Sequence, residues 1–192
     1  RMTTTPAASR PENLLLPNLW DDARAALMSE SEKLLYRSNL LGSDKRVTNY
    51  GGGNTSAKVM EKDPLTGEMA EVLWVKGSGG DIGSMKLDGF ATLYMEKLES
   101  LKSLYKSLDQ EDAMVHALNH CTFDLNPRAP SIDTCLHGYV PYPHVDHVHS
   151  DAAFFLRQTS ADDASAVGFF LAADFTNITH FTPPESNPFK KN

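Results

Sequence analysis

The feature that most constrains the fold is a strand-like stretch with a glycine-rich segment at each end. GGGNTS occupies residues 51–56, and VKGSGGDIG occupies residues 75–83. Between them, residues 56–60 and 71–77 have the apolar composition of β-strands, and DPLTGEM at residues 63–69 has the composition of a tight turn. The sequence therefore predicts a β-hairpin that joins two glycine-rich loops.

Helical spacing is found on both sides of this hairpin. Upstream, apolar residues recur at intervals of three and four, and Gly42 is a natural stop. A further helix should start after the histidines of residues 144–149, with Ser150 or Asp151 as its N-cap. The order of helix, hairpin, helices, strand and helix predicts a layered α/β domain with a mostly antiparallel sheet. The predicted helices cover residues 21–41, 87–108, 111–121 and 134–139, and a strand is predicted to end at the histidines.

Composition excludes several classes of protein. The 192 residues suit one domain that can bury its own core. The net charge is −7 and no basic block occurs, which argues against a nucleic-acid partner. The longest apolar runs are too short to span a membrane, and the first residues lack the apolar core of a secretory signal. The two cysteines, Cys121 and Cys135, form no CxxC pair, so we expect a cytoplasmic protein without membrane association.

The sequence pattern divides the chain into three parts. Residues 1–17 have the composition of a disordered lead-in, residues 18–158 form the domain, and residues 159–192 are an atypical tail rich in Pro, Asn and Lys. The tail offers too little periodic pattern for the strands and helices that should complete the sheet. We therefore expect a domain that is truncated or altered at its C-terminus.

Three histidines and two aspartates fall within HVDHVHSD, residues 144–151. Alternate residues of a strand point to the same face, so His147 and His149 should present their imidazoles side by side, whereas His144 should face away. Such an H-x-H pair can give two nitrogen ligands to zinc, with a third ligand from elsewhere. The alternative is a partly exposed strand end that carries polar residues, and the motif alone does not decide between the two.

The two glycine-rich loops could bind an anion. Glycines let the backbone come close to a ligand and expose N–H groups to it. Asn54, Thr55 and Ser56 add neutral donors in the first loop, and Lys76 and Ser78 add a cation and a hydroxyl in the second. Each loop could equally be a surface turn, and GGGNTS has the spacing of neither a Walker loop nor a GxGxxG fingerprint.

The segment APSIDTCLH, residues 129–137, carries two further candidates. Ser131 could donate a hydrogen bond to a phosphate. Asp133 is a carboxylate upstream of the histidine pair, and a carboxylate beside a metal is suited to proton transfer at a carbon next to a polarised carbonyl. Either side chain could also cap the helix that follows.

Three stretches of the chain together resemble a known family. They are YRSNLLGSDKRVTNYGGGNTSAK, EVLWVKGSGGDIGSMK and PSIDTCLHGYVPYPHVDHVHSDA. They contain four motifs in the order of the family: the two glycine-rich loops, the segment with Ser131 and Asp133, and the H-x-H pair. Over about residues 18–153 the chain therefore resembles the class II aldolase/adducin family. The likeness is greatest to the aldolase part of bifunctional rhamnulose-1-phosphate aldolase/alcohol dehydrogenase proteins. The resemblance implies a three-layer α/β/α domain around a central, mostly antiparallel sheet, assembled as a homo-oligomer that is usually a tetramer.

The resemblance also implies a reaction and the residues for it. The aldolases of the family cleave a 1-phosphorylated ketose, here one like rhamnulose 1-phosphate, to dihydroxyacetone phosphate and an aldehyde. Asp133 falls on the position of the acid/base carboxylate. His147 and His149 fall on positions of zinc ligands, although another divalent metal could take the place of zinc. The residues on phosphate-binding positions of the family are Gly53, Asn54, Thr55, Ser78, Gly79 and Ser131.

Two departures from the family pattern bear on activity. Asp133 stands where glutamate is commoner, and its shorter side chain moves the carboxylate by roughly an ångström. The third zinc histidine of the family comes well after the H-x-H and beside glycines, a context that His180 in NITHFTPP does not have. The enzyme could therefore be inactive as this chain. The sequence also leaves open an epimerase, dehydratase or decarboxylase of the same family, and a non-catalytic adducin-like binding or assembly module.

Overall fold

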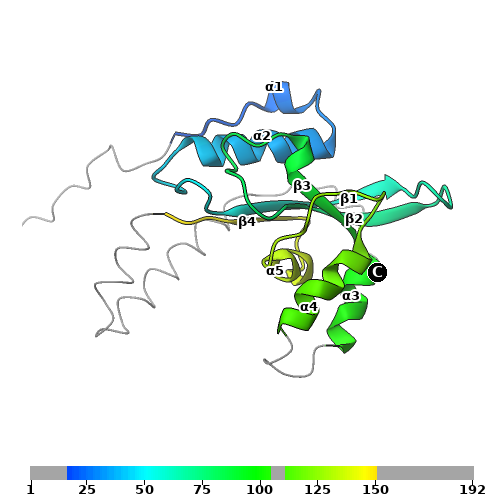
Figure 1. Ribbon diagram of the computed structural model, residues 1–192. Helices are drawn as coiled ribbons and strands as arrows, with labels where there is room; N and C mark the ends of the chain where they lie inside the picture. Colours follow the sequence, from blue (N-terminus) through cyan, green and yellow to red (C-terminus); the bar gives the residue numbers. More distant parts are fainter. Residues whose placement is uncertain (1–16, 105–110, 151–192) are drawn as a thin grey trace, which may run out of the picture.

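The computed structural model describes residues 17–104 and 111–150, and within them a four-stranded sheet lies between two layers of helices (Figure 1). The strand order is β3-β2-β1-β4, and neighbouring strands are antiparallel. Helix α2 covers one face of the sheet, with α1 on its far side, and α3, α4 and α5 lie on the other face. The predicted α/β class with a central antiparallel sheet is therefore confirmed. The strands are β1 (Asn54–Lys62), β2 (Met69–Lys76), β3 (Phe90–Tyr94) and β4 (His144–His147), and the helices are α1 (Asp22–Ala25), α2 (Glu30–Ser43), α3 (Met95–Ser100), α4 (Glu111–Ala117) and α5 (Thr134–Tyr139).

The predicted hairpin is formed by β1 and β2, which pair over most of their length. Asp63 closes the turn, because its Oδ1 accepts hydrogen bonds of 2.8 Å from the backbone N–H groups of Leu65 and Thr66. Gly67 adopts a φ of +74°, a conformation that favours glycine. Both glycine-rich loops consequently lie at the same end of the hairpin, opposite this turn.

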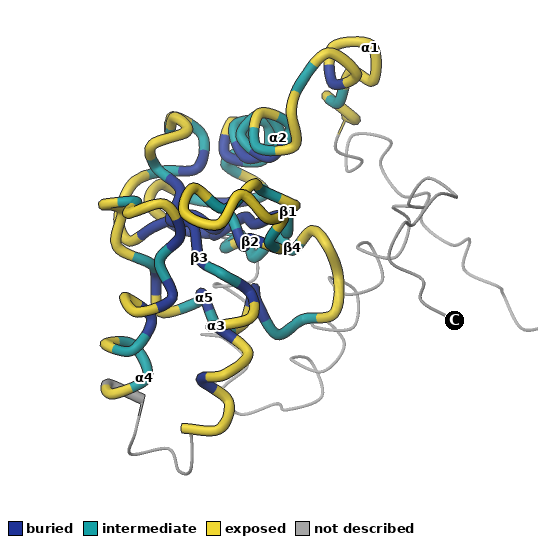
Figure 2. The backbone as a smooth tube through the Cα atoms, turned by 90° about the vertical axis from the view of Figure 1, so that its right-hand side faces the viewer, coloured by how far each residue is buried: buried dark blue, intermediate teal, exposed yellow. Residues whose placement is uncertain are grey.

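Alternation along β1 directs its side chains to two cores, one on each face of the sheet. Thr55 and Ala57 face α2, and Ala57 packs there against Leu34. Asn54 and Ser56 face α5. Figure 2 shows the buried backbone concentrated in the sheet and in the parts of the helices that face it. The larger core, on the side of α3 and α5, consists of Leu73, Val75, Ala91, Leu93, Met95, Leu98, Leu101, Leu118 and Cys121.

The prediction of one helix over residues 21–41 is wrong, because the structure has two helices there, α1 and α2. Leu27, one of the apolar residues of this stretch, lies between the two helices and is 90% exposed. The second helix starts at a capping box in which Ser29 Oγ accepts from the Glu32 N–H and the Glu32 carboxylate accepts from the Ser29 N–H. These bonds satisfy N–H groups that are free at a helix start, so a new helix begins after Ser29.

The long helix predicted over residues 87–108 is also wrong. Residues 90–94 form the edge strand β3, which pairs with β2, and the shorter helix α3 follows it. The spacing of Phe90 and Leu93 suits a helix, but as strand residues they enter the two cores on opposite faces of the sheet. Pairing with β2 therefore outweighs the local helical spacing. Short 3-10 turns cover Leu87–Gly89 and Leu101–Ser103.

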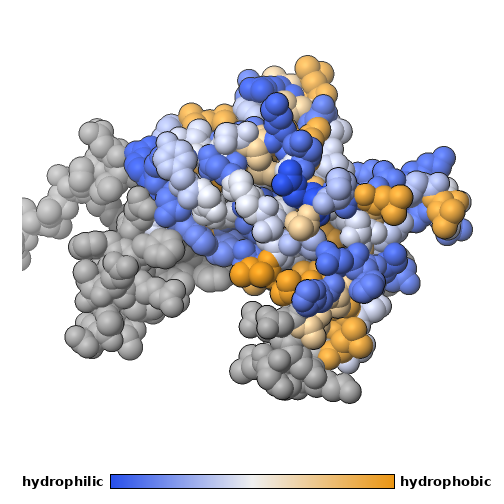
Figure 3. Space-filling view, viewed as in Figure 1, coloured by the Kyte–Doolittle hydropathy of each residue, from blue (hydrophilic) through white to orange (hydrophobic). Residues whose placement is uncertain are grey.

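Three other predicted elements are confirmed. Helix α5 has the bounds predicted for it, and α4 is continued by a 3-10 turn, Leu118–Cys121. The strand that leads to the histidines is β4. The helix expected from Ser150 or Asp151 falls on residues outside the described part of the chain. Among the described residues, no helix is long and apolar enough to cross a membrane. Hydrophilic residues predominate on the face drawn in Figure 3, with hydrophobic ones scattered among them.

Candidate functional site

The first glycine-rich loop lies directly against the histidine segment. Asn54, the first residue of β1, pairs in register with His147, the last residue of β4. Gly53 has a φ of +76°, and a Cβ at this position would come within 2.9 Å of the His147 carbonyl oxygen. A Cβ on Gly52 would lie 2.5 Å from Asn49 Oδ1 and 3.1 Å from His149 Cβ. Glycine is required at Gly53, where the positive φ and the His147 carbonyl both oppose a side chain.

Asn54 is the centre of a buried polar cluster. Its Nδ2 donates a 2.6 Å hydrogen bond to Ser131 Oγ, and its Oδ1 accepts from Lys76 Nζ at 3.4 Å. All three residues are buried. Burial lowers the pKa of Lys76, and the carboxylates of Asp133 and Asp81 act in the opposite direction. A buried ammonium group beside an amide and a hydroxyl is suited to binding an anion.

The second glycine-rich loop lies beside the segment that carries Ser131. Gly77 forms a backbone bridge with Pro130, and the Ser78 N–H donates to the Ala129 carbonyl at 3.0 Å. Ser78 and Gly79 are exposed, and Gly79 has a φ of +73°. These two exposed residues therefore lie next to the segment that carries Ser131.

Thr55 is separated from the other phosphate-site candidates. Its Oγ1 lies 2.6 Å from Ser38 Oγ, in the buried layer between β1 and α2. Because neighbouring strand residues point to opposite faces, the Thr55 hydroxyl cannot reach a ligand that contacts Asn54 on the α5 side. The structure brings together Asn54, Ser131 and the second loop, but it places the Thr55 hydroxyl elsewhere.

The two imidazoles of the H-x-H pair lie side by side, as predicted, although β4 ends at His147 and His149 lies just beyond the strand. His147 Nε2 and His149 Nε2 are 3.1 Å apart, and the ring centroids are 4.7 Å apart. Two nitrogens bound to one tetrahedral zinc at about 2.0–2.1 Å would be separated by about 3.3 Å, so the pair fits as two ligands of one metal ion. Within residues 17–104 and 111–150, no group of three or more His, Cys, Asp or Glu side chains is arranged to hold a metal.

Asp133 lies beside this pair, at the N-cap position of α5. Its Oδ2 is 4.0 Å from His147 Nδ1, which is too long for a hydrogen bond. His147 Nδ1 is buried and has no hydrogen-bond partner among the described residues. The Asp133 side chain makes no capping hydrogen bond to α5. Helix capping therefore does not account for this carboxylate, and it faces the histidine pair.

His137 is part of the same region, and the sequence analysis did not identify it. It is fully buried, and its Nδ1 lies 2.7 Å from Ser56 Oγ. Burial, with a smaller contribution from His147, lowers the pKa of His137 to about 4. A histidine inside a short helix has no distinctive sequence context, so only the packing of α5 against β1 identifies it.

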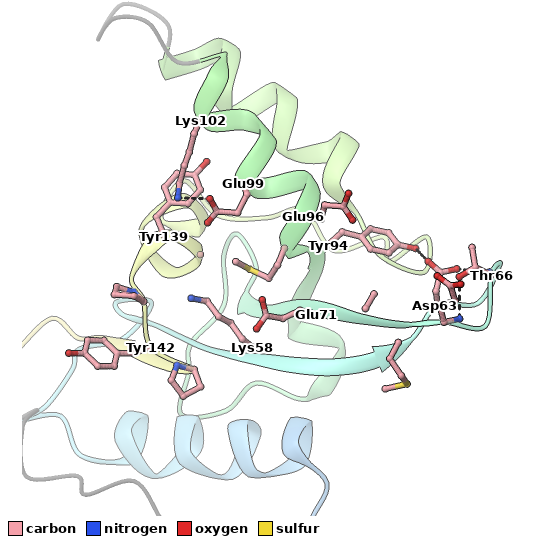
Figure 4. Close-up of a pocket in the computed structure, with 17 residues that line it drawn as sticks. Lys58, Asp63, Thr66, Glu71, Tyr94, Glu96, Glu99, Lys102, Tyr139 and Tyr142 are labelled. Carbon is pink, nitrogen blue, oxygen red and sulfur yellow. Dashed lines mark hydrogen bonds and ion pairs between the residues drawn. The ribbon is translucent and has the colours of Figure 1, made fainter. Parts of the chain in front are cut away.

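A separate groove of about 980 Å³ lies on the α3 and α5 side of the hairpin (Figure 4). Several of its polar groups are already engaged: Tyr94 Oη donates to Asp63, and Lys102 forms an ion pair with Glu99. Lys58 Nζ donates to the Val140 carbonyl. The candidate phosphate, acid/base and metal residues do not line this groove, so it is distinct from the site around Asn54.

Comparison with known proteins places this fold in a superfamily. No protein-family model matches the chain. A solved structure, the N-terminal class II aldolase domain of a conserved protein from Thermoplasma acidophilum, is similar with a TM-score of 0.66 and 33% identity, over 79% of this chain and 67% of that one. The chain belongs to the class II aldolase superfamily.

A curated relative is also similar in sequence. The uncharacterized oxidoreductase YuxG of Bacillus subtilis (strain 168) is 48% identical over 141 residues, which are 72% of this chain. The matched part is 20% of that relative, so the chain spans about a fifth of its length.

Proposed function

We propose that the chain is a zinc-dependent aldolase domain that cleaves a 1-phosphorylated ketose, such as rhamnulose 1-phosphate, to dihydroxyacetone phosphate and an aldehyde. One observation carries this proposal. The polar cluster around Asn54, the carboxylate of Asp133 and the imidazoles of His147 and His149 converge at one end of the sheet. Anion binding, proton transfer and metal binding are the three functions that such a cleavage needs.

The substrate phosphate would bind at the Asn54 cluster. The amide of Asn54 and the hydroxyl of Ser131 are donors, and the Lys76 ammonium supplies positive charge. Gly53 and Gly79 would contribute backbone N–H groups, as glycine-rich loops do for phosphates, and Ser78 would contribute its hydroxyl because its N–H is bonded to the Ala129 carbonyl. Thr55 would contribute through its backbone rather than its hydroxyl, because the hydroxyl faces α2.

His147 and His149 would hold the metal ion, with a third ligand from outside the described residues. Bound zinc would supply Lewis-acid stabilisation of negative charge that develops on the ketose oxygens. Asp133 would carry the proton to the carbon that loses its aldehyde partner. Its position 4.0 Å from His147 Nδ1 supports this role, because the carboxylate and the ligand pair would then flank the same substrate carbons.

The direct test uses the purified 192-residue chain, its zinc content by mass spectrometry, and a cleavage assay with rhamnulose 1-phosphate that detects dihydroxyacetone phosphate. We expect about one zinc ion per chain and turnover that stops when a chelator removes the metal. Stoichiometric zinc without cleavage would instead favour an epimerase, dehydratase or decarboxylase of the same family.

A second candidate is a non-catalytic, adducin-like binding or assembly module. It is favoured because, among the described residues, the two histidines proposed to bind the metal are not joined by a third ligand for it. Absence of both stoichiometric zinc and turnover would support this module. We also propose, from the family resemblance, a homo-oligomer in the cytoplasm, and sedimentation of the purified chain would show whether it is a tetramer. The oxidoreductase name of the Bacillus relative refers to a protein about five times longer than the matched part.

A further inference from the structure

Asp133 is bracketed by two hydrogen bonds that join its segment to β1. Before it, Ser131 accepts from Asn54 Nδ2 at 2.6 Å. After it, His137 Nδ1 lies 2.7 Å from Ser56 Oγ. The two bonds are made by alternate residues of β1 and enclose the start of α5 between them. The position of Asp133 relative to the sheet is therefore determined at two points.

The second bond also reaches β4, the strand that carries His147. Ser56 pairs with Val145 in the sheet, and Ser56 Oγ donates to the Val145 carbonyl at 3.4 Å. With that hydroxyl proton directed at Val145, the Ser56 oxygen accepts from His137 in the tautomer that carries its proton on Nδ1. The hydrogen bonds thus run from α5 through β1 to β4, two residues from His147.

Packing alone does not account for a histidine at this position. The ring is fully buried, and its Nε2 has no hydrogen-bond partner among the described residues. A buried polar atom without a partner lowers stability, and an apolar side chain of similar volume would avoid that cost. The polar ring therefore contributes something other than core packing, and its one short hydrogen bond points to positioning.

We propose that His137 is a positioning residue: its hydrogen bond to Ser56 fixes α5 against the β1–β4 pair and so holds the Asp133 carboxylate beside the His147 ring. This inference rests on the proposed aldolase function for its kinetic consequence. Its structural consequence, the separation of Asp133 from His147, does not depend on activity. A displacement of about 1 Å between reacting groups can lower a rate by about a hundredfold.

The test compares the wild-type chain with three variants. Ser56→Ala removes the acceptor with little change in volume, His137→Leu removes the donor, and His137→Asn keeps an N–H donor near the position of Nδ1. With rhamnulose 1-phosphate and zinc, we expect kcat to fall by about tenfold or more in Ser56→Ala and His137→Leu. KM should stay within about threefold, because the Asn54 cluster is intact, and His137→Asn should recover most of kcat.

Crystal structures of the same four chains give the second readout. The Asp133–His147 separation should exceed 4.0 Å in Ser56→Ala and His137→Leu and return toward it in His137→Asn. If wild-type chain does not cleave the sugar phosphate, the proposed function fails and the structures alone decide the inference. An unchanged separation, or a loss of kcat that His137→Asn does not recover, would overturn it. If His137→Leu does not fold, Ser56→Ala carries the comparison.

Discussion

Lys76 combines burial with a positive charge. It is 4% exposed, and its ammonium reaches Asn54 rather than a carboxylate within hydrogen-bond distance. A buried cation that is only partly compensated by Asp133 and Asp81 favours an incoming anion. The family positions mapped from the sequence did not include this lysine, although VKGSGG indicated it as a candidate.

We expect Asn54→Ala to raise KM for a phosphorylated ketose by about tenfold, because a hydrogen bond to a charged group contributes about 1.5–3 kcal/mol. The loss should be smaller for the same sugar without phosphate. Steady-state kinetics with both substrates measure the difference. Asn119→Ala, a change of an exposed asparagine far from this cluster in the sequence, is the matched control. Equal KM values for Asn54→Ala and wild type would contradict a phosphate site at Asn54.

His137 also makes stability depend on pH. Its pKa is about 4 in the folded chain and near 6.5 when unfolded, so between these values only the unfolded chain binds the proton. His137 therefore does not lower the free energy of unfolding above about pH 6.5, and it lowers that free energy progressively as the pH drops toward 4. The shift corresponds to about 3 kcal/mol. Urea unfolding of wild type and His137→Asn at pH 7 and pH 4.5 measures this contribution, and the variant should lose less stability. Parallel pH profiles would show that His137 is not the group responsible.

At the scale of elements, the end of α2 holds the second glycine-rich loop in place. Gly42 contacts the backbone of Gly83 so closely that a Cβ on either glycine would collide with the other residue. Asn39 Nδ2 adds a 2.9 Å hydrogen bond to the Ile82 carbonyl. The loop that carries Ser78 and Gly79 is thus attached to α2 at one end and, through Gly77, to Pro130 at the other.

Gly42→Ala should therefore destabilise the chain by about 1–3 kcal/mol, since neither backbone can move without displacing the loop. An alanine in an exposed helix would normally stabilise it, so the sign of the effect is diagnostic. Ser43→Ala, at the neighbouring exposed position, is the control and should change stability by less than about 0.5 kcal/mol. Urea denaturation of both variants provides the values, and equal midpoints would disprove the close contact.

At the scale of the whole molecule, the site is formed where two helical layers and a sheet bring distant segments together. Asn54 and Ser131 are in direct contact although 77 residues separate them in the chain. Strand β1 connects these segments, because it pairs with β2, which leads into the second glycine-rich loop, and with β4, which carries His147. Metal binding by His147, at the end of β4, and by His149, just beyond it, should consequently stabilise the entire domain.

Zinc at a hundred times its dissociation constant should raise the free energy of unfolding by about 2.7 kcal/mol, provided that the unfolded chain does not bind it. His147→Ala should abolish this increase. His144→Ala is the matched control, because His144 lies on the same strand at an exposed position and is not part of the pair. Thermal unfolding with and without zinc and with a chelator measures the effect. An increase that survives in His147→Ala would place the metal elsewhere.

Much of the fold could be predicted because its signals are local. Turn residues at Asp63 and Gly67 determine the hairpin, and the period of two along a strand placed His147 and His149 on one side. The bounds of α5 followed from its own sequence. In each case the backbone preference of a few neighbouring residues agrees with the tertiary arrangement.

Only the tertiary structure decided the remaining features, since they depend on pairing between segments far apart in the chain. Phe90 and Leu93 have helical spacing, but the free edge of β2 makes them a strand. The direction of the Thr55 hydroxyl depends on which face of β1 meets α2, and the role of His137 depends on α5 packing against Ser56. Local periodicity specifies which elements form, whereas the burial of one face against a distant partner specifies which side chains meet.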